Sequence, residues 1–524
     1  MAQAAEGDHA VTQHVELEVK FDVPASATSP SFDHLTSVSR VETLPSQSLD
    51  AVYYDTPGHD LAAKWVTLRR RTGGRDAGWH LKLPDGGDGR TEVHAPLETP
   101  LDARTSAAGT KVPEGLVDVV RAIVRDRPLM PVAHICTTRR LQLLYGADDL
   151  PLAEFADDEV TAWRIDPADG SPLAAQCWHE WELEVSESRV GGDSDETPEQ
   201  LLHRLGVRLQ EAGAVPAGHG SKLAKVLGTA PAPPPPSDPV HAEALEQIDE
   251  LLKWDRAMRA DAFDSVHQMR VIIRKIRSLL QASEGAFGLT DDASILRELR
   301  ELAAVLGVAR DAEVLAERYE RALAALPPEL VRGPVRERLV GGVQRTYRSG
   351  RRRSLAAMRS QRYFQLLDEL DALAQNPPPT AAPVGKHAPI DVAYRRLRKA
   401  AKSAKAAATS DGDDRDHALH QLRKKAKRLR YIAAAVDRPE IAAPAKTIQT
   451  LLGDHQDSVV SRAHLSDVAA AAHAAGEDTF TYGLLYQQED DLARRSREQL
   501  DDAVEALRQN MRRGRKKRGE RVGL

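Results

Sequence analysis

The chain has 524 residues, of which 72 are Lys or Arg and 78 are Asp or Glu, giving a formal net charge of −6. This length is enough for about two to four domains. The two cysteines, Cys136 and Cys177, are too few for a disulfide framework and fit a reducing compartment. The sequence contains no signal peptide and no run of about 18 apolar residues, so we expect a soluble cytoplasmic protein.

A proline-rich segment separates two halves of different composition. Residues 229–239 include the run from Pro233 to Pro236, which is typical of a stiff extended spacer. Residues 1–237 hold 22 Lys and Arg against 36 Asp and Glu, whereas residues 238–524 hold 50 against 42. The mild overall acidity therefore hides a basic C-terminal half. We divide the chain into a disordered N-terminus (1–12), a strand-rich domain (13–228), the proline-rich linker (229–239), a helical domain (240–509) and a basic tail (510–524).

Charged and apolar residues alternate in two runs of the first half. These runs are Glu16-Leu17-Glu18-Val19-Lys20 and Glu180-Trp181-Glu182-Leu183-Glu184. Because side chains alternate between the two faces of a strand, each run predicts a strand with one ionised face. Carboxylates gathered from two such faces could hold a hard divalent cation through their oxygens. For either strand alone, a solvated face with carboxylates by chance is the simpler alternative.

The segments between these runs supply cations on further predicted strands. Leu68-Arg69-Arg70-Arg71 places Arg69 and Arg71 on one face. The runs 79–83 and 90–94 flank a Gly/Asp cluster that indicates a hairpin. The candidate cations are Lys20, Arg69, Arg71, Lys82, Arg139 and Lys222. Acids and bases together on alternating strands indicate a metal chelated by a polyanion, with Arg and Lys binding the phosphate oxygens.

Residues 13–228 resemble a CYTH domain, the fold of triphosphate tunnel metalloenzymes. The matching motifs, in chain order, are Glu16-x-Glu18-x-Lys20, Tyr53-Tyr54-Asp55-Thr56-Pro57, Leu68-Arg69-x-Arg71, Lys82, the acidic strand Glu180 to Glu184, and Ser221-Lys222. The resemblance implies an eight-stranded antiparallel barrel with a charged tunnel just wide enough for one ligand. It also implies Mg²⁺ or Mn²⁺ as the cofactor. We expect the metal ligands among Glu16, Glu18, Asp158, Glu182 and Glu184.

The sequence departs from the family pattern at one position and is ambiguous at another. The family often carries Lys-x-Arg where this chain has Thr137-Thr138-Arg139, which removes one phosphate-binding cation. Asp157 and Asp158 both match an acidic position of the family, and we favour Asp158. The first difference bears on substrate preference more than on metal binding.

The second half contains an internal repeat. His267, Arg270, Arg274 and Arg277 recur with the same spacing as His420, Arg423, Lys427 and Arg430. On a helix these offsets fall within an arc of about 80°, opposite an apolar face formed by Met269, Ile272, Ile273, Ile276 and Leu280. A second repeated element, Leu-Gly-x-x-x-Asp, occurs at 306–311 and 452–457. The pattern predicts two helical bundles, at about 240–375 and 388–509, related by a pseudo-twofold axis.

This repeat resembles the CHAD domain, a family named for its histidines and helices. The resemblance implies two four-helix bundles around a basic channel that binds inorganic polyphosphate. A solvated basic face is the alternative for one such helix. The basic run 512–518 is most often a disordered tail, which could add nonspecific, salt-sensitive attraction to polyanions. The whole chain is thus expected to be an α+β multidomain protein.

The sequence predicts a metal-dependent inorganic triphosphatase whose helical half binds polyphosphate, in the cytoplasm and near polyphosphate granules. Lys20, Arg69, Arg71, Lys82, Arg139 and Lys222 would bind triphosphate, and Glu180, Glu182 or Glu184 would orient the attacking water. One alternative, kept open by Thr137, is a non-catalytic polyphosphate-binding protein. Another is a triphosphatase or cyclase acting on thiamine triphosphate or ATP. Nucleic acid is a less favoured partner because aromatic residues make up only 4% of the chain. No membrane partner is expected.

Overall fold

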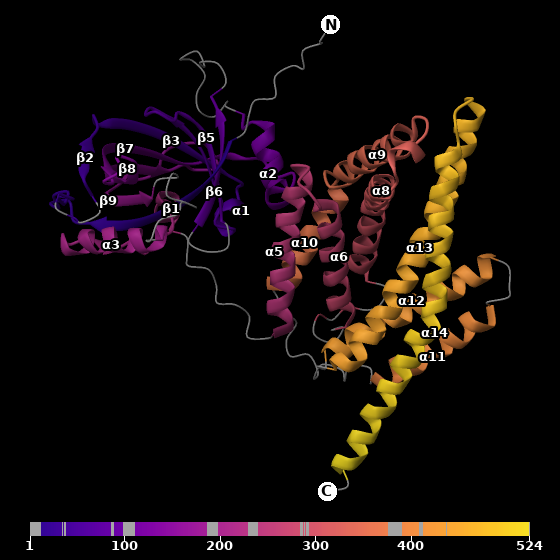
Figure 1. The fold of residues 1–524 in the computed structure, drawn as a ribbon. Coiled ribbons are helices and arrows are strands. Elements are labelled where there is room, and N and C mark those ends of the chain that lie inside the picture. Colours follow the sequence, from indigo (N-terminus) through magenta and orange to yellow (C-terminus); the bar gives the residue numbers. More distant parts are fainter. Residues whose placement is uncertain are drawn as a thin grey trace. The chain divides into compact units, whose positions relative to one another are not determined.

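The computed structural model describes residues 12–33, 35, 38–84, 89–97, 111–185, 197–228, 239–282, 287, 289, 293–375, 390–407, 412–435 and 438–522 (Figure 1). The chain divides into two compact units, Met1–Pro236 with Leu252–Ala262, and Ser237–Leu251 with Phe263–Leu524. The division falls within α5 (Pro239–Arg259). Residues 1–11 of the predicted N-terminus (1–12) and most of the predicted linker lie outside the described residues.

The first unit, here called the strand unit, is built on one antiparallel sheet. Its strands are β1 (Thr12–Val23), β2 (Arg40–Thr43), β3 (Gln47–Asp55), β4 (Thr67–Thr72), β5 (Gly78–Pro84), β6 (Gly89–Pro96), β7 (Met130–Tyr145), β8 (Pro151–Arg164), β9 (Gln176–Val185) and β10 (Val215–Pro216). They pair in the order β10-β1-β6-β5-β4-β3-β7-β8-β9, and β2 pairs with β7. Because β1 also pairs with β9, the pairing returns to its starting strand and the sheet curves around a central space.

Helices on the outside of the sheet decide which strand faces turn inward. Trp181 and Leu183 of β9 pack in one apolar cluster with Leu205 and Leu209 of α3 (Pro198–Glu211). Alternation then turns the intervening glutamates to the opposite face, toward the central space. A capping box at Thr197 fixes the start of α3. The ionised face predicted for this strand is therefore the inner one.

Two further helices, α2 (Glu114–Val124) and α4 (Lys222–Leu227), pack against the outer and inner faces of the sheet. On the outside, α2 packs against β3 to β6, with Val120 in a cluster that includes Leu68 and Leu81. On the inside, Leu223 of α4 packs with Ile135 of β7. This packing, and a cap in which Ser221 accepts a hydrogen bond from the Ala224 backbone, place the first turn of α4 beside the inner strand faces.

One residue of the motif Tyr53 to Pro57, Asp55, has a structural role in this fold. Asp55 is fully buried and accepts hydrogen bonds from the backbone N–H groups of Thr56, Leu61 and Ala62, at 2.7, 2.9 and 3.0 Å. Two of these donors belong to α1 (Asp60–Ala63). A carboxylate that satisfies helix N-terminal donors stabilises the helix end. The aspartate of this motif therefore anchors α1 to the end of β3.

The second unit, here called the helical unit, is made of long helices. They are α6 (Ser265–Ala282), α8 (Ser294–Ala324), α9 (Gly342–Ala357), α10 (Gln361–Gln375), α11 (Ile390–Ala406), α12 (Gly412–Ala435), α13 (Pro439–Ala474) and α14 (Phe480–Val522), with short turns at Pro328–Leu330 and Glu337–Gly341. An antiparallel sheet followed by a helical region, as predicted, is confirmed. In the described chain, none of the helices combines the length and apolarity needed to cross a membrane.

The apolar faces predicted for the repeated helices form the core of this unit. Met269, Ile273 and Leu280 of α6 are buried, and Leu422 and Leu429 of α12 lie in a cluster shared with α11, α13 and α14. One difference concerns the C-terminus, where α14 continues through Val522, so that the described part of the basic tail is helical. Arg and Lys are good helix formers, which explains why the helix does not end near residue 509.

Candidate functional site

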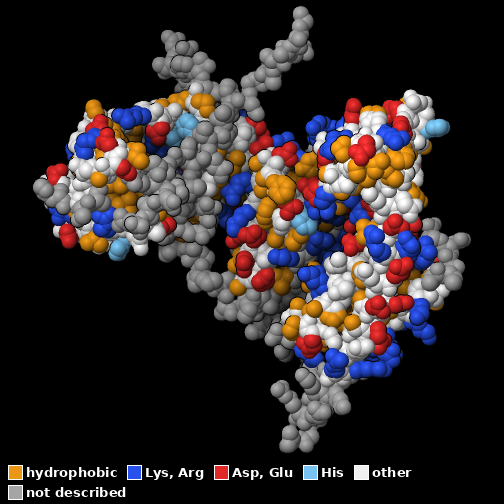
Figure 2. Space-filling model, viewed as in Figure 1, with side chains coloured by type: hydrophobic (Ala, Val, Ile, Leu, Met, Phe, Trp, Pro, Cys, Tyr) orange, Lys and Arg blue, Asp and Glu red, His pale blue; other side chains and the backbone are white. Residues whose placement is uncertain are grey.

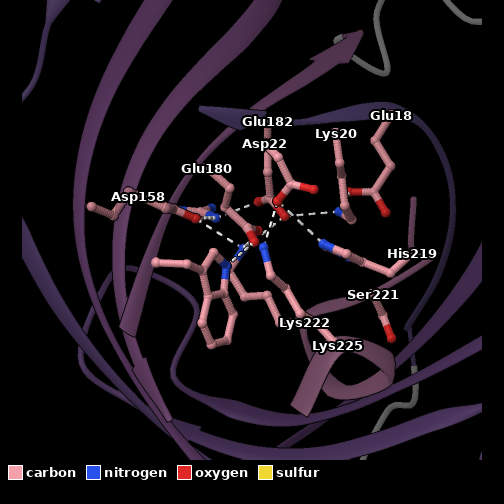
Figure 3. A network of polar contacts seen from close by, with 12 residues as sticks. Glu18, Lys20, Asp22, Asp158, Glu180, Glu182, His219, Ser221, Lys222 and Lys225 are labelled. Atoms are coloured by element: carbon pink, nitrogen blue, oxygen red, sulfur yellow. Dashed lines mark hydrogen bonds and ion pairs between the residues drawn. The ribbon is translucent and has the colours of Figure 1, made fainter. Parts of the chain in front are cut away.

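A buried network of acids and bases fills the central space of the strand unit (Figure 3). Lys20 of β1 contacts two carboxylates, with its Nζ 2.5 Å from Oε2 of Glu18 and 2.8 Å from Oε1 of Glu182. In the β1–β9 ladder, Lys20 lies opposite Glu182 and Glu18 lies opposite Glu184. The register of these two strands therefore places the two alternating runs face to face.

Lys222 joins the network from α4. Its Nζ lies 2.6 Å from Oε1 of Glu180, 2.7 Å from Oε1 of Glu182 and 3.0 Å from Oδ2 of Asp158. Asp158 and Glu180 are fully buried and Lys222 is 8% exposed. Figure 3 shows the three carboxylates and this ammonium group converging from the strand walls and the helix end. An ammonium group shared among buried carboxylates offsets their desolvation.

Arg139 of β7 binds two of the same acids, Asp158 and Glu182. Its Nε and Nη2 donate to the two oxygens of Asp158 at 2.8 and 2.6 Å, and Nη2 also lies 2.5 Å from Oε2 of Glu182. Asp157, the alternative to Asp158, turns to the other face, where it contacts His179 at 2.5 Å. The structure thus brings Asp158, and not Asp157, into the network.

The inner glutamates differ in their tendency to ionise. Burial opposes ionisation of Glu18, but Lys20 and Lys82 outweigh it and hold its pKa at about 2. Burial likewise opposes ionisation of Glu182, yet Lys20 and Lys222 hold its pKa well below the usual range. Glu184 behaves in the opposite way, because burial outweighs the attraction of Lys82 and raises its pKa to about 7. One inner carboxyl therefore exchanges a proton near neutral pH.

Two arginines of β4 form a second, cationic part of the central space. Burial, together with the nearby charges of Arg69 and Arg139, lowers the pKa of Arg71 to about 9. The side chain of Arg71 is nearly buried and pairs with Asp76, while Arg69 donates to the Tyr53 hydroxyl at 3.4 Å. Three guanidinium groups held this close favour an anion between them. Lys82 of β5 lies near Glu18 and Glu184 and so links the two parts.

The structure adds residues that sequence reasoning missed. Asp22 continues the alternation of β1 and contacts Lys225 at 2.5 Å and His219 at 3.4 Å. Trp178 continues the alternation of β9 and donates through its indole N–H to Glu180 at 2.5 Å. Both lay two residues beyond the runs, so the same period could have found them. The side chain of Glu16, by contrast, lies outside the described residues.

The carboxylates of the network fit a hard divalent cation. Single oxygens of Asp158, Glu180 and Glu182 all lie within 4.8 Å of one another. Oε1 of Glu180 is buried and, apart from the nearby ammonium of Lys222, has no hydrogen-bond partner in the described structure. An all-oxygen set of this kind suits Mg²⁺ or Mn²⁺. The ammonium and guanidinium groups, however, already balance most of this negative charge.

In the helical unit, the two repeated sets of basic residues approach one another. We call these sets the stripes: His267, Arg270, Arg274 and Arg277 on α6, and His420, Arg423, Lys427 and Arg430 on α12. Burial and the nearby charges of Arg270 and Arg423 lower the pKa of Arg274, and burial with Arg274 and Arg423 lowers that of Lys427. Arg274 lies on α6 and Lys427 on α12, so cations from both repeats share one surface. Figure 2 shows Lys and Arg side chains gathered over these two helices. We call Arg270, Arg274, Arg423 and Lys427 the basic cluster.

The repeated Leu-Gly-x-x-x-Asp element explains how two arginines of the basic cluster, Arg270 and Arg423, are positioned. A Cβ built on Gly307 of α8 would lie 3.5 Å from Nη2 of Arg270, and one on Gly453 of α13 would lie 3.4 Å from Nη2 of Arg423. In each repeat an arginine therefore lies flat against a glycine of the next helix. Both glycines precede an aspartate by four residues, and Asp311 pairs with Arg270 at 3.3 Å. The repeat fixes the position of one arginine in each copy.

Other members of the stripes differ in their surroundings. The Nε atoms of Arg270 and Arg277 are buried without a hydrogen-bond partner in the described part of the chain. Arg430 donates to Gln449 at 3.1 Å. Burial and Arg310 lower the pKa of His267, and burial and Lys424 lower that of His420. Both histidines are therefore neutral at pH 7, and two arginines each bury one donor that has no described partner.

Comparison with known families agrees with the division of the chain into a strand unit and a helical unit. The CYTH domain model matches residues 14–189, and the CHAD domain model matches residues 242–466. CYTH proteins form the class of triphosphate tunnel metalloenzymes. The chain is 58% identical over 517 residues to the uncharacterized protein Rv2226 of Mycobacterium tuberculosis, covering 96% of this chain and 98% of that one. The chain belongs to the family that joins a CYTH domain to a CHAD domain.

Solved structures give weaker likenesses. PptA from Streptomyces chartreusis is 20% identical with a TM-score of 0.42, covering 51% of this chain and 98% of its own. The CHAD domain from the plant Ricinus communis is 20% identical with a TM-score of 0.37, covering 51% of this chain and 90% of its own.

Proposed function

We propose that the strand unit is a metal-dependent inorganic triphosphatase and that the helical unit binds inorganic polyphosphate. The observation that carries the proposal is the buried network in which Lys20, Arg139 and Lys222 share the carboxylates of Asp158, Glu180 and Glu182. Such a network can take up a polyanion and a cation together. We further propose that the ring of eight strands, β1 and β3 to β9, is the triphosphate tunnel.

The charge balance of the network supports joint binding of substrate and metal. Without a ligand, the ammonium and guanidinium groups lie on the carboxylates that would hold a cation. Triphosphate oxygens would draw Lys20, Arg139 and Lys222 away, because a polyanion is the stronger partner for them. Asp158, Glu180 and Glu182 would then be left to hold Mg²⁺ or Mn²⁺. A divalent cation held there would supply charge neutralisation to the phosphate and would acidify a bound water.

The cationic part of the tunnel would hold the rest of the substrate. Arg69 and Arg71 lie near Arg139, and burial makes their interaction with phosphate strong. Lys82 extends this surface toward Glu184. These groups would stabilise the charge that moves to the leaving phosphate during transfer. No residue that reads a base or a thiazole ring is recognised in this set, which favours the inorganic substrate over ATP or thiamine triphosphate.

Glu184 is the best candidate to accept the proton of the attacking water. Its pKa of about 7, raised by burial, suits a group that exchanges a proton at neutral pH. A base must be deprotonated to act, so we expect kcat/KM for triphosphate to rise as pH increases through about 7. Glu184→Gln should lower turnover and remove this inflection. If the variant keeps both the rate and the pH profile, Glu184 is not the base.

The helical unit supports polyphosphate binding through the basic cluster. Cations from both repeats share one surface, and a long chain could contact both at once, which raises avidity through effective concentration. The planar guanidinium groups of Arg270 and Arg423 suit phosphate oxygens, which they can bind through two donors at once. The predicted sets His267, Arg270, Arg274, Arg277 and His420, Arg423, Lys427, Arg430 are proposed as the binding residues. Association with polyphosphate granules would follow from this binding.

A second candidate is a tunnel that binds triphosphate without turnover. Thr137, buried in the tunnel wall where the family often has a lysine, favours it. The experiment that separates the two measures phosphate release by the full chain from tripolyphosphate, ATP, thiamine triphosphate and long polyphosphate, with and without Mg²⁺ or Mn²⁺. Metal-dependent release from tripolyphosphate above the other substrates supports the proposal. Tight triphosphate binding without release would favour the second candidate.

A further inference from the structure

A group of potential metal ligands lies on the wall of the strand unit, apart from the tunnel network. Nε2 of His134 lies 2.9 Å from Oδ2 of Asp50, and Sγ of Cys136 lies 3.6 Å from the same oxygen and 3.8 Å from Nε2 of His134. One ligand atom from each residue lies within 4.8 Å of the other two. The three residues come from two paired strands, β3 and β7, on which Asp50 lies opposite Cys136.

The alternation of β7 places this group on the outer face of the sheet. Arg139 of the same strand points into the central space, where it binds Asp158. His134 and Cys136 lie an odd number of residues away, so they point to the opposite face. Asp50 is exposed, while His134 and Cys136 are half-buried. A cation bound here would therefore be reached from solvent and would not share ligands with the tunnel.

The two distances from the sulfur atom are close to those on one face of a tetrahedral site. A tetrahedral Zn²⁺ with bonds of about 2.0–2.3 Å holds its ligand atoms about 3.3–3.6 Å apart. The two sulfur distances, 3.6 and 3.8 Å, are close to this range, and the shorter oxygen–nitrogen distance is that of a hydrogen bond. Binding a cation would release two protons to solvent, the one between Nε2 of His134 and Asp50 and the thiol proton of Cys136, and would require only a small separation of Asp50 and His134. The ring of Trp163 packs beside that of His134, with the ring centroids 5.4 Å apart.

We propose that Asp50, His134 and Cys136 form a binding site for a borderline-soft divalent cation, Zn²⁺ or its analogue Co²⁺. A thiolate, an imidazole and a carboxylate favour such a cation over Mg²⁺, which prefers oxygen ligands alone. Three protein ligands leave the fourth position to solvent. The bound cation ties β3 to β7, two strands whose opposite faces line the tunnel through Tyr53 and Arg139. The two metal sites of the strand unit thus differ in ligand chemistry and in cation.

Cobalt absorption provides a direct test, because a Co²⁺–thiolate bond gives a charge-transfer band that oxygen ligands do not. The reduced full chain is titrated with Co²⁺ in excess Mg²⁺, which occupies the oxygen site. We expect one equivalent of Co²⁺ to produce the band and Zn²⁺ to remove it. Zn²⁺ should also raise the melting temperature of the strand unit, since a ligand that binds only the folded state stabilises it.

The variants make the assignment specific. Cys136→Ser should abolish the charge-transfer band, and His134→Gln should weaken Co²⁺ affinity about 10-fold or more. Cys177→Ser is the matched control, because Cys177 is the other free cysteine and lies on β9. Circular dichroism checks that each variant is folded. Absence of the band in the parent chain, its survival in Cys136→Ser, or its loss in Cys177→Ser would each overturn the proposal.

Discussion

The strand unit and the helical unit use cations in opposite ways. In the strand unit, Lys20, Arg139 and Lys222 each contact at least two carboxylates. In the helical unit, neither Arg274 nor Lys427 forms an ion pair with a described carboxylate, and each lies near like charges. The first arrangement is nearly balanced before any ligand binds. The second keeps uncompensated positive charge that an external polyanion can neutralise.

Under the proposed function, this difference would let one chain treat short and long polyphosphates separately. Binding in a balanced network requires exchange of partners, which couples the anion to a cation and suits a reaction site. Binding to uncompensated cations requires no exchange and depends mainly on counterion release. We therefore expect metal dependence in the strand unit and salt dependence in the helical unit. The predictions below test each side of this contrast.

The largest effect is expected from breaking the balanced network at its centre. Glu182→Gln keeps the size of the side chain but removes the charge that Lys20, Arg139 and Lys222 share. Metal-dependent phosphate release should fall by about 10²–10³-fold, the scale of losing one group that stabilises a transition state. Steady-state release of phosphate from tripolyphosphate measures it.

A matched control for this variant lies on the same sheet. Glu159→Gln removes a carboxylate from β8 that is exposed and pairs with Arg140 at 2.7 Å. Its rate should equal that of the parent chain. Equal rates for Glu182→Gln and the parent chain would remove Glu182 from the site, whereas equal losses in both variants would point to a general effect of charge.

Replacing one lysine in each unit should have opposite effects on stability. Lys222→Met leaves buried Asp158 and Glu180 without their shared cation, and breaking a buried pair costs about 3–5 kcal/mol. Lys427→Met removes repulsion among cations and should leave the helical unit as stable or stabilise it by about 0.3 kcal/mol.

Urea unfolding can follow the two units separately. All six tryptophans lie in residues assigned to the strand unit, so their fluorescence reports its unfolding, while far-UV circular dichroism is dominated by the helical unit. The contrast between the units is wrong if Lys427→Met destabilises the helices as strongly as Lys222→Met destabilises the strands.

The sequence predicted which face of a strand or helix a side chain lies on better than it predicted which distant residues that side chain contacts. Periods of 2 and 3.6 residues placed Glu18, Lys20 and Glu182 on an inner strand face and Met269 on a buried helix face, because alternation is a local property. Period alone does not give the register between distant strands. The meeting of Lys222 with three carboxylates depends on α4 entering the central space, and neither this nor the raised pKa of Glu184 is visible in a linear motif.

The contacts of Asp55, His134 and Cys136 could not be predicted from the sequence either, because they also depend on tertiary packing. Asp55 looked like part of a functional motif, yet its carboxylate holds the N-terminus of α1. His134 and Cys136 stood next to a recognised motif but on the opposite face, and their partner Asp50 is brought in by the β3–β7 pairing. Tertiary packing decides such contacts, and sequence spacing alone does not contain it.

Weakening the basic cluster should reduce polyphosphate binding without changing turnover of tripolyphosphate. Arg270→Ala with Arg423→Ala removes one glycine-packed arginine from each repeat. Each charge-assisted contact contributes roughly 1.5–3 kcal/mol, so affinity of the full chain for long polyphosphate should fall about 10²-fold or more. The slope of log affinity against log salt should also become shallower.

The controls for the basic cluster use the other end of each stripe and a competing polyanion. Arg277→Ala with Arg430→Ala should behave in the same way if the stripes act as units. RNA of similar charge should compete poorly with polyphosphate. Unchanged affinity in both double variants would exclude the stripes from the binding surface, and tighter binding of RNA would make nucleic acid the better partner.

The smallest effect is expected from the two histidines. Burial and neighbouring cations lower the pKa of His267 and His420, so both are neutral in the free chain at pH 7. A bound polyanion favours their charged form, which means that binding takes up protons. Polyphosphate affinity should therefore increase as pH falls from about 7 to 5, by roughly 10-fold at most.

The stability of the free chain should show the opposite trend and should decrease as pH falls below the unfolded-state pKa of about 6.5. The reason is that the lowered pKa values of the two histidines in the folded state disfavour protonation. Replacing both histidines with Gln should flatten the pH dependence of affinity while leaving affinity at pH 8 unchanged. Isothermal titration in buffers of different ionisation enthalpy measures the proton uptake directly, and zero uptake at pH 6 would show that these histidines do not face the bound chain.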